Sequence, residues 1–103
     1  MTTIEEKNKS ISVEQEFYDY LKNVKNMAES SCRSFISSIH SAEKFAKKNN
    51  YSSIALFSED VNEAEVTNRE LIDDPAFQEL DREKNFRFSN AISKLMVFYH
   101  TRK

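Results

Sequence analysis

The chain has 103 residues, of which 31% are charged and 39% hydrophobic, and its formal net charge at pH 7 is −2. It contains no glycine. This excludes phosphate-binding loops, dinucleotide-binding fingerprints and glycine-dependent hairpins, because each of them needs glycine for positive φ or for close backbone approach. A helical protein tolerates the absence of glycine best, so we expect one all-α domain with a single core.

The single cysteine, Cys32, excludes an internal disulfide bond. The first ten residues, MTTIEEKNKS, are charged where a signal peptide needs an apolar stretch. The longest apolar runs, IALF at 54–57 and LMVFY at 95–99, are too short to cross a bilayer. We therefore expect a cytoplasmic protein with no membrane-spanning segment.

Residues 1–12 are polar with little periodicity, and we expect them to form a flexible N-terminal arm ahead of a single helical domain at 13–103. A first helix is predicted to begin near Glu14. Its apolar positions recur every three or four residues and predict one buried face: Phe17, Leu21, Val24 and Ala28.

A second, long helix is predicted to run to about Lys48, with Ser30 or Ser31 as its N-cap. Asn49 and Asn50 are expected to take the left-handed conformation that glycine usually supplies at a helix end.

The segment at 51–60 reads as a short turn or single helical turn. We expect three of its apolar side chains to point inward: Ile54, Leu56 and Phe57. Ser58 is expected to cap the next helix, predicted at 61–72. That helix must end before Pro75, because the residue preceding a proline disfavours helical angles.

A short fourth helix is predicted to open with Pro75 in its first turn, capped by Asp73 or Asp74. The last helix is predicted at 86–100, where apolar residues form one broad face. Together these segments predict a compact orthogonal bundle of four to five helices. The predicted core contains Phe17, Leu21, Phe35, Ile39, Phe45, Leu71, Phe77, Leu80, Ile92, Leu95 and Phe98.

Charge is unevenly distributed along the chain. The block at 59–83 carries ten acidic and two basic residues, whereas 31–58 carries one acidic and four basic residues. The block at 84–103 carries five basic and no acidic residues. The small net charge therefore hides a polarised molecule, and its local basic surfaces are candidates for phosphate contact.

The second helix has a basic face opposite its apolar one. At 100° per residue, five polar side chains form one stripe in which the other four fall within about 40° of Arg33, with Lys48 at the margin of the stripe. They are Arg33, Ser37, His40, Lys44 and Lys47. These residue types donate hydrogen bonds to phosphate oxygens. The alternative is a solvated helix face whose terminal lysines complement the helix dipole.

The last helix repeats this pattern less sharply. Arg87 and Lys94 lie seven residues apart on the face opposite the apolar one, and Arg102 extends the basic end. If the two helices pack side by side, their basic stripes are expected to merge into one concave patch that follows a nucleic-acid backbone. The alternative is a polar outer face on a terminal helix.

Other chemistry finds little support in the sequence. The acidic residues Asp60, Glu63 and Glu65 lack the spacing of a hard-cation loop and favour a solvated face. His40 and His100 stand in no metal-binding frame, and Cys32 has no evident base partner. We therefore expect no enzyme activity, no catalytic residue, no metal site and no cofactor.

Four aromatic residues are candidates for stacking on nucleic-acid bases: Tyr18, Tyr20, Phe86 and Phe88. Phe86 is the strongest candidate. The alternative for all four is a place in the core.

The order of these features resembles a known family. FYDYL opens the first helix, SSCRSFISSIHSAEKFAKK forms the second and NFRFSNAISKLMVFY forms the last. This arrangement, over residues 14–100, resembles the SAM-like, core-binding N-terminal domain of tyrosine recombinases and phage integrases. The family's catalytic domain has no counterpart, since YHTR at 99–102 differs in spacing from its His-x-x-Arg motif.

In that family such a domain forms half of a clamp on the backbone of duplex DNA, while a separate domain cuts. The resemblance implies that the exposed residues of the second helix face DNA. We therefore predict non-catalytic binding of duplex DNA through the basic faces of the second and last helices. The alternative is a protein-interaction module, such as a phage or mobile-element accessory factor that binds a host protein through the acidic surface or an apolar patch near Met96 and Val97. A monomer or weak homodimer fits either function.

Overall fold

The computed structural model describes residues 12–102, and all of the regular structure in that range is helical. The prediction of a small all-α bundle is confirmed. The predicted N-terminal arm lies outside the described residues, except for Ser12. Five α-helices and one π-helical turn follow in chain order: α2 (Val13–Asp19), η1 (Tyr20–Val24), α3 (Glu29–Lys48), α4 (Val61–Asp73), α5 (Pro75–Glu83) and α6 (Arg87–Thr101).

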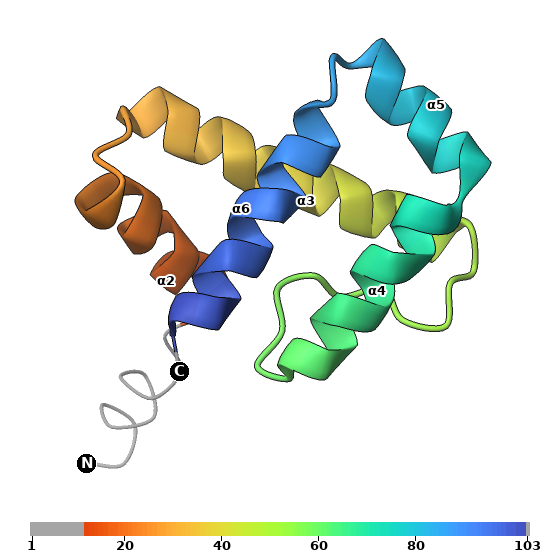
Figure 1. The fold of residues 1–103 in the computed structure, drawn as a ribbon, viewed down its shortest axis with the longest axis horizontal. Helices are drawn as coiled ribbons and strands as arrows, with labels where there is room; N and C mark the ends of the chain where they lie inside the picture. The colour runs from red at the N-terminus through yellow and green to blue at the C-terminus, as the bar shows by residue number, and fades with distance from the viewer. Residues whose placement is uncertain (1–11, 103) are drawn as a thin grey trace.

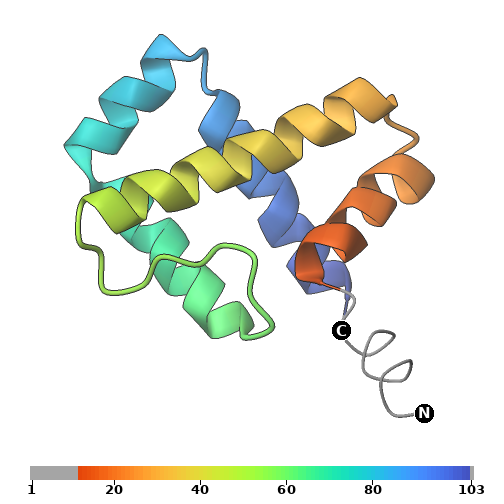
Figure 2. The same cartoon turned by 180° about the vertical axis from the view of Figure 1, so that it is seen from behind.

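The longest helix, α3, packs across α6, and this is the most extensive contact between helices. Figure 1 shows α6 crossing in front of α3, and Figure 2 shows the same crossing from behind. The α2–η1 segment lies beside one end of this pair, and α4 and α5 lie toward the other. Within the described residues, no helix has both the length and the apolar character needed to cross a membrane.

The core lies where the apolar faces of these helices meet. Most of the predicted core residues are buried, while Phe35, Phe45 and Leu80 are partly buried and pack against them. Phe17 of α2 packs its ring against Phe57 and Phe98, with ring centroids 6.0 and 5.5 Å apart. The core therefore joins segments that are distant in sequence.

The predicted face of the first helix is correct only in its first half. Ser12 accepts a hydrogen bond from the amide of Gln15 and caps α2. After Asp19 the chain winds into the π-helical turn η1, and Asn26 then takes a positive φ of 56°. The wider turn breaks the predicted register, so Val24 is 63% exposed, and Ala28, beyond the helix, is exposed as well.

The caps of α3 differ from the prediction at one end. The helix begins at Glu29 with Ala28 at the N-cap position, where no side chain caps it, so the predicted Ser30 or Ser31 cap is wrong. At the other end Asn50 has a φ of 58°, whereas Asn49 has a φ of −101°. Asn50 therefore takes the left-handed role predicted for the pair.

The connection between α3 and α4 has no helical turn and is held by side chains of two helices. Glu43 of α3 accepts hydrogen bonds at Oε2 from the amides of Leu56 and Phe57, at 2.7 and 2.9 Å. The buried hydroxyl of Tyr99 donates to the carbonyl of Leu56 and accepts from the amide of Ser58. Leu56 is buried and Phe57 half-buried as predicted, but Ile54 is exposed.

The following two helices begin at aspartate caps. Asp60, and not the predicted Ser58, caps α4 by accepting from the amide of Asn62. Ser58 instead donates to the carboxylate of Glu63. Asp74 caps α5 through the amide of Ala76, next to Pro75 at the first helical position, as predicted.

The turn from α5 to α6 carries two successive left-handed residues, Asn85 and Phe86, with φ values of 58° and 61°. Neither is glycine, and a bulky aromatic residue in this conformation is strained. The buried carboxylate of Asp81 compensates by accepting hydrogen bonds from the amides of Phe88 and Ser89, both at 3.1 Å. Asp81 thus provides a hydrogen-bond acceptor for amides in the first turn of α6, where the N-cap residue Phe86 makes no side-chain hydrogen bond.

We predict that Asp81→Ala lowers the free energy of unfolding by about 2 kcal/mol, because two amides at the start of α6 lose their acceptor. Asp81→Asn keeps one acceptor oxygen and is expected to recover part of this loss. Urea unfolding curves measure the effect. The exposed Asp73 is the control, and its change to alanine is expected to stay within about 0.5 kcal/mol of the wild type. An equally small effect at Asp81 would contradict this account of the cap.

Two phenol groups, that of the buried Tyr99 and that of the partly buried Tyr51, predict a loss of stability at alkaline pH. Burial raises the pKa of Tyr99, and burial together with the hydrogen bond to Asp74 raises the pKa of Tyr51 above the usual tyrosine range. The neutral phenol is therefore favoured by folding. This contribution is complete below the unfolded-state pKa of about 10 and is lost as pH rises above it.

We therefore expect the free energy of unfolding to fall above about pH 10, and to fall less steeply in a variant with Tyr51→Phe plus Tyr99→Phe. Denaturant unfolding at a series of pH values gives both slopes. Equal slopes in the two proteins would rule out these two phenols as the cause.

Candidate nucleic-acid interface

The predicted basic face of α3 is on the surface. All of its members are exposed, while the opposite face buries Ile39, Ala42 and Ala46. The 3.6-residue period thus predicted correctly which face of this helix is exposed and which is buried. The exposed set is Arg33, Ser37, His40, Lys44, Lys47 and Lys48.

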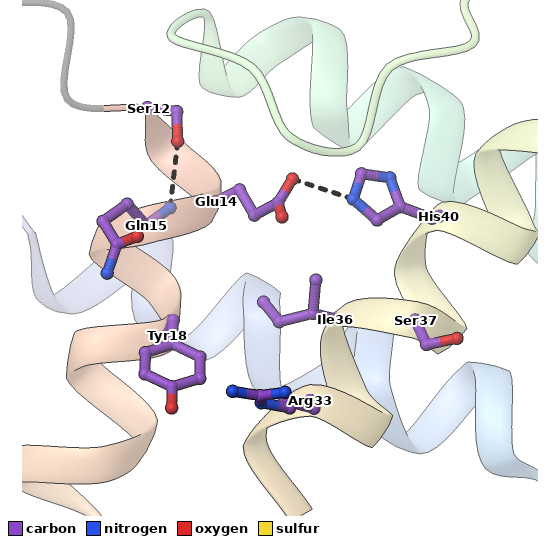
Figure 3. A pocket seen from close by; sticks show the side chains of 8 residues that line it. All are labelled: Ser12, Glu14, Gln15, Tyr18, Arg33, Ile36, Ser37 and His40. Atoms are coloured by element: carbon purple, nitrogen blue, oxygen red, sulfur yellow. Dashed lines mark hydrogen bonds and ion pairs between the residues drawn. The ribbon is translucent and has the colours of Figure 1, made fainter. Parts of the chain in front are cut away.

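In the N-terminal half of this face, Arg33 and His40 contact carboxylates. The guanidinium of Arg33 lies 2.6 Å from the Glu29 carboxylate, one helical turn away. The hydrogen bond and charge of Glu29 raise the pKa of Arg33. Arg33 also lines a pocket of about 390 Å³ between α2 and α3, whose eight lining side chains are drawn in Figure 3.

His40 connects three elements. Its Nε2 lies 2.8 Å from Oε1 of Glu14 on α2, a contact drawn in Figure 3, and its Nδ1 lies 3.4 Å from Oε1 of Glu43. Its ring also meets the edge of Phe57, with centroids 5.4 Å apart. These contacts give His40 a structural role in holding α2 and the loop after α3, which the sequence pattern did not indicate.

The C-terminal half of the face is different. Lys44, Lys47 and Lys48 form no ion pair with any carboxylate in residues 12–102. Lys44 and Lys47 border a pocket of about 530 Å³ together with His40, Glu43 and the loop residues at 54–55. One oxygen of the Glu43 carboxylate binds the amides of this loop. The three lysines therefore form the part of the stripe whose charges are left free among these residues.

The cations of α6 are spread over separate surfaces. Arg87 lines a pocket with the N-terminal half of α3, and Lys94 is half-buried. Arg102 lies 3.1 Å from Glu16 and 3.9 Å from Glu59, and its guanidinium carbon is 5.6 Å from the centre of the Phe98 ring. Arg102 is thus bound to carboxylates of two other segments.

The predicted merging of the two basic stripes is not observed. Although α3 and α6 pack together, they do so through their apolar faces. Arg33 and His40 line the pocket beside α2, whereas Arg87 and Asn90 line another pocket and Arg102 a third. The structure therefore brings together Lys44, Lys47 and Lys48 and places the α6 cations elsewhere.

The acidic block has structural contacts. Asp60 and Asp74 cap helices, and Glu70 accepts a hydrogen bond from Ser52. No cluster of three histidine, cysteine or acidic side chains with metal-binding geometry occurs in the described part of the chain. Of the aromatic residues considered for base stacking, Phe88 is buried, Tyr18 and Tyr20 are half-buried, and Phe86 is 53% exposed.

Comparisons of the chain with protein-family models, with curated proteins and with solved structures found no significant match in any of the three. The resemblance to the core-binding domain of tyrosine recombinases therefore stays a prediction.

Proposed function

We propose that this protein is a non-catalytic domain that binds duplex DNA through the C-terminal half of α3. The observation that carries the proposal is the group of exposed lysines Lys44, Lys47 and Lys48, which pair with no carboxylate among residues 12–102. A phosphate backbone is a polymer of negative charge, and lysines gain affinity for it by releasing its counterions. Free cations supply this gain best, because no ion pair has to be broken first.

The surroundings of the lysines support the same surface. Glu43, the one acidic residue in the neighbouring pocket, directs an oxygen to the amides of Leu56 and Phe57. Arg33 and His40 take a secondary place in this proposal, since both already contact carboxylates. The interface is therefore centred one to two helical turns farther along α3 than the full stripe suggested.

This surface is tested by charge reversal. We expect Lys44→Glu plus Lys47→Glu to weaken binding to labelled duplex DNA by at least about tenfold, across all sequences, because backbone contacts carry no sequence information. Fluorescence anisotropy gives the affinities, and circular dichroism verifies that the variant folds.

The matched control is Lys22→Glu plus Arg69→Glu, which changes the net charge equally at exposed positions on η1 and α4. It is expected to retain most of the affinity. Unchanged affinity in the α3 variant, or an equal loss in the control, would contradict an interface centred on these lysines.

A second candidate function is protein binding through an apolar groove between α4 and α6. This groove, of about 280 Å³, is lined by Ile72, Phe77, Ile92 and Met96 among others, and Ile72 is 56% exposed. Such grooves accept the apolar face of an amphipathic helix. Association through it is expected to persist at high salt, since apolar contacts are not screened, whereas DNA binding weakens.

A further inference from the structure

A pocket rich in serine lies where the N-terminal halves of α3 and α6 meet, at the opposite end of α3 from Lys44, Lys47 and Lys48. Its volume is about 320 Å³. Figure 1 shows the two helices that form it. Its polar lining consists of Ser30, Ser31, Ser34, Ser38, Arg87 and Asn90.

The polar side chains of this lining are hydrogen-bond donors, and Phe35 adds an apolar wall. Of the five pockets described within residues 12–102, it is the one that has a cation and no carboxylate in its lining. The nearest acidic residue along α3, Glu29, is bound to Arg33. A guanidinium beside hydroxyl and amide groups offers planar, charge-assisted donors of the kind that recognise phosphate oxygens.

Ser38 supports the same site. Its residue exposure is 3%, it lines the pocket, and its hydroxyl has no hydrogen-bond partner among the described residues. No fully enclosed side-chain nitrogen or oxygen in these residues lacks a partner, so the Ser38 oxygen reaches the pocket space. Buried hydroxyls are normally satisfied, and a ligand oxygen in the pocket would satisfy this one.

The backbone adds to the preference for an anion. No side chain caps α3 at Ala28, so the amides of its first turn are free to donate. The positive end of the helix dipole lies at the same place. The strained Phe86 immediately precedes Arg87, and strain of this kind persists where surrounding structure holds it and tends to occur at functional positions.

We propose that this pocket binds the phosphate group of a phosphomonoester. Arg87 is the charged anchor, and the serine hydroxyls, Asn90 and the first amides of α3 donate to the remaining oxygens. The volume lies at the lower end of the range of about 300–1,000 Å³ for small-molecule sites, which leaves room for the group that carries the phosphate. The pocket goes beyond DNA binding by the lysines and does not depend on it.

Two sources share this chemistry: a free phosphorylated small molecule and the terminal phosphate of a nucleic-acid strand. ¹H–¹⁵N NMR titrations separate them. The probes are inorganic phosphate, a nucleoside 5′-monophosphate, and an oligothymidylate with and without a 5′-phosphate. We expect saturable shifts of the Ser30 and Ser31 amides with phosphate and with the monophosphate. If the 5′-phosphorylated strand shifts them and the 5′-hydroxyl strand does not, the pocket also accepts strand ends.

Arg87→Gln is expected to weaken phosphate and monophosphate binding by at least about tenfold, because a charge-assisted hydrogen bond is lost. The control Arg69→Gln removes the same charge at an exposed position of α4, outside the pocket. This variant is expected to bind phosphate and the monophosphate as the wild type does. Absence of saturable shifts with every phosphate probe, or an equal loss in both variants, would overturn the proposal. Lys44→Glu plus Lys47→Glu separates the two sites, since it is expected to leave the phosphate titration intact even if duplex DNA does not bind.

Discussion

The packing of α3 across α6 is the contact on which the other elements depend. Both helices bury small or branched apolar side chains in the shared core, among them Ile39 and Ala42 on α3 and Ala91 on α6. Small residues let two helix backbones approach closely. This crossing determines which face of α3 is left for solvent, and it brings Glu43 and Tyr99 to the loop that both of them hold. The exposed lysines and the serine pocket are consequences of the same crossing, at opposite ends of α3.

A chain without glycine must end its helices by other means. Asn26, Asn50 and Asn85 take the left-handed conformation that asparagine tolerates better than other residues with a side chain. Phe86 follows the last of them, and aromatic residues have no such tolerance. The buried carboxylate of Asp81 holds this turn by binding the first amides of α6. The strained residue thus stands beside Arg87, the cation of the proposed phosphate pocket.

The helices could be predicted from sequence because apolar spacing and caps are local signals. The faces of α3 and α6 followed from their period, and Pro75 marked the start of α5. The π-helical turn after Asp19 left no such signal, so the burial expected for Val24 was wrong. The candidate site was harder to predict from sequence, because charged side chains pair with residues that are distant in the chain. His40, for example, contacts Glu14, 26 residues away. Periodicity identified the basic residues, and only the tertiary packing showed which of them pair with carboxylates of residues 12–102.

We propose that Lys44, Lys47 and Lys48 of α3, which pair with no carboxylate of residues 12–102, bind a phosphate backbone. The salt dependence of duplex-DNA binding by the wild-type protein tests this binding most directly. Affinity that depends on counterion release falls steeply as the salt concentration rises, whereas affinity that depends on apolar contacts does not. Three neutralised phosphates predict an affinity that falls by about 40-fold between about 50 and 200 mM salt. An affinity that does not change over this range, or no binding at the lower salt concentration, would contradict it.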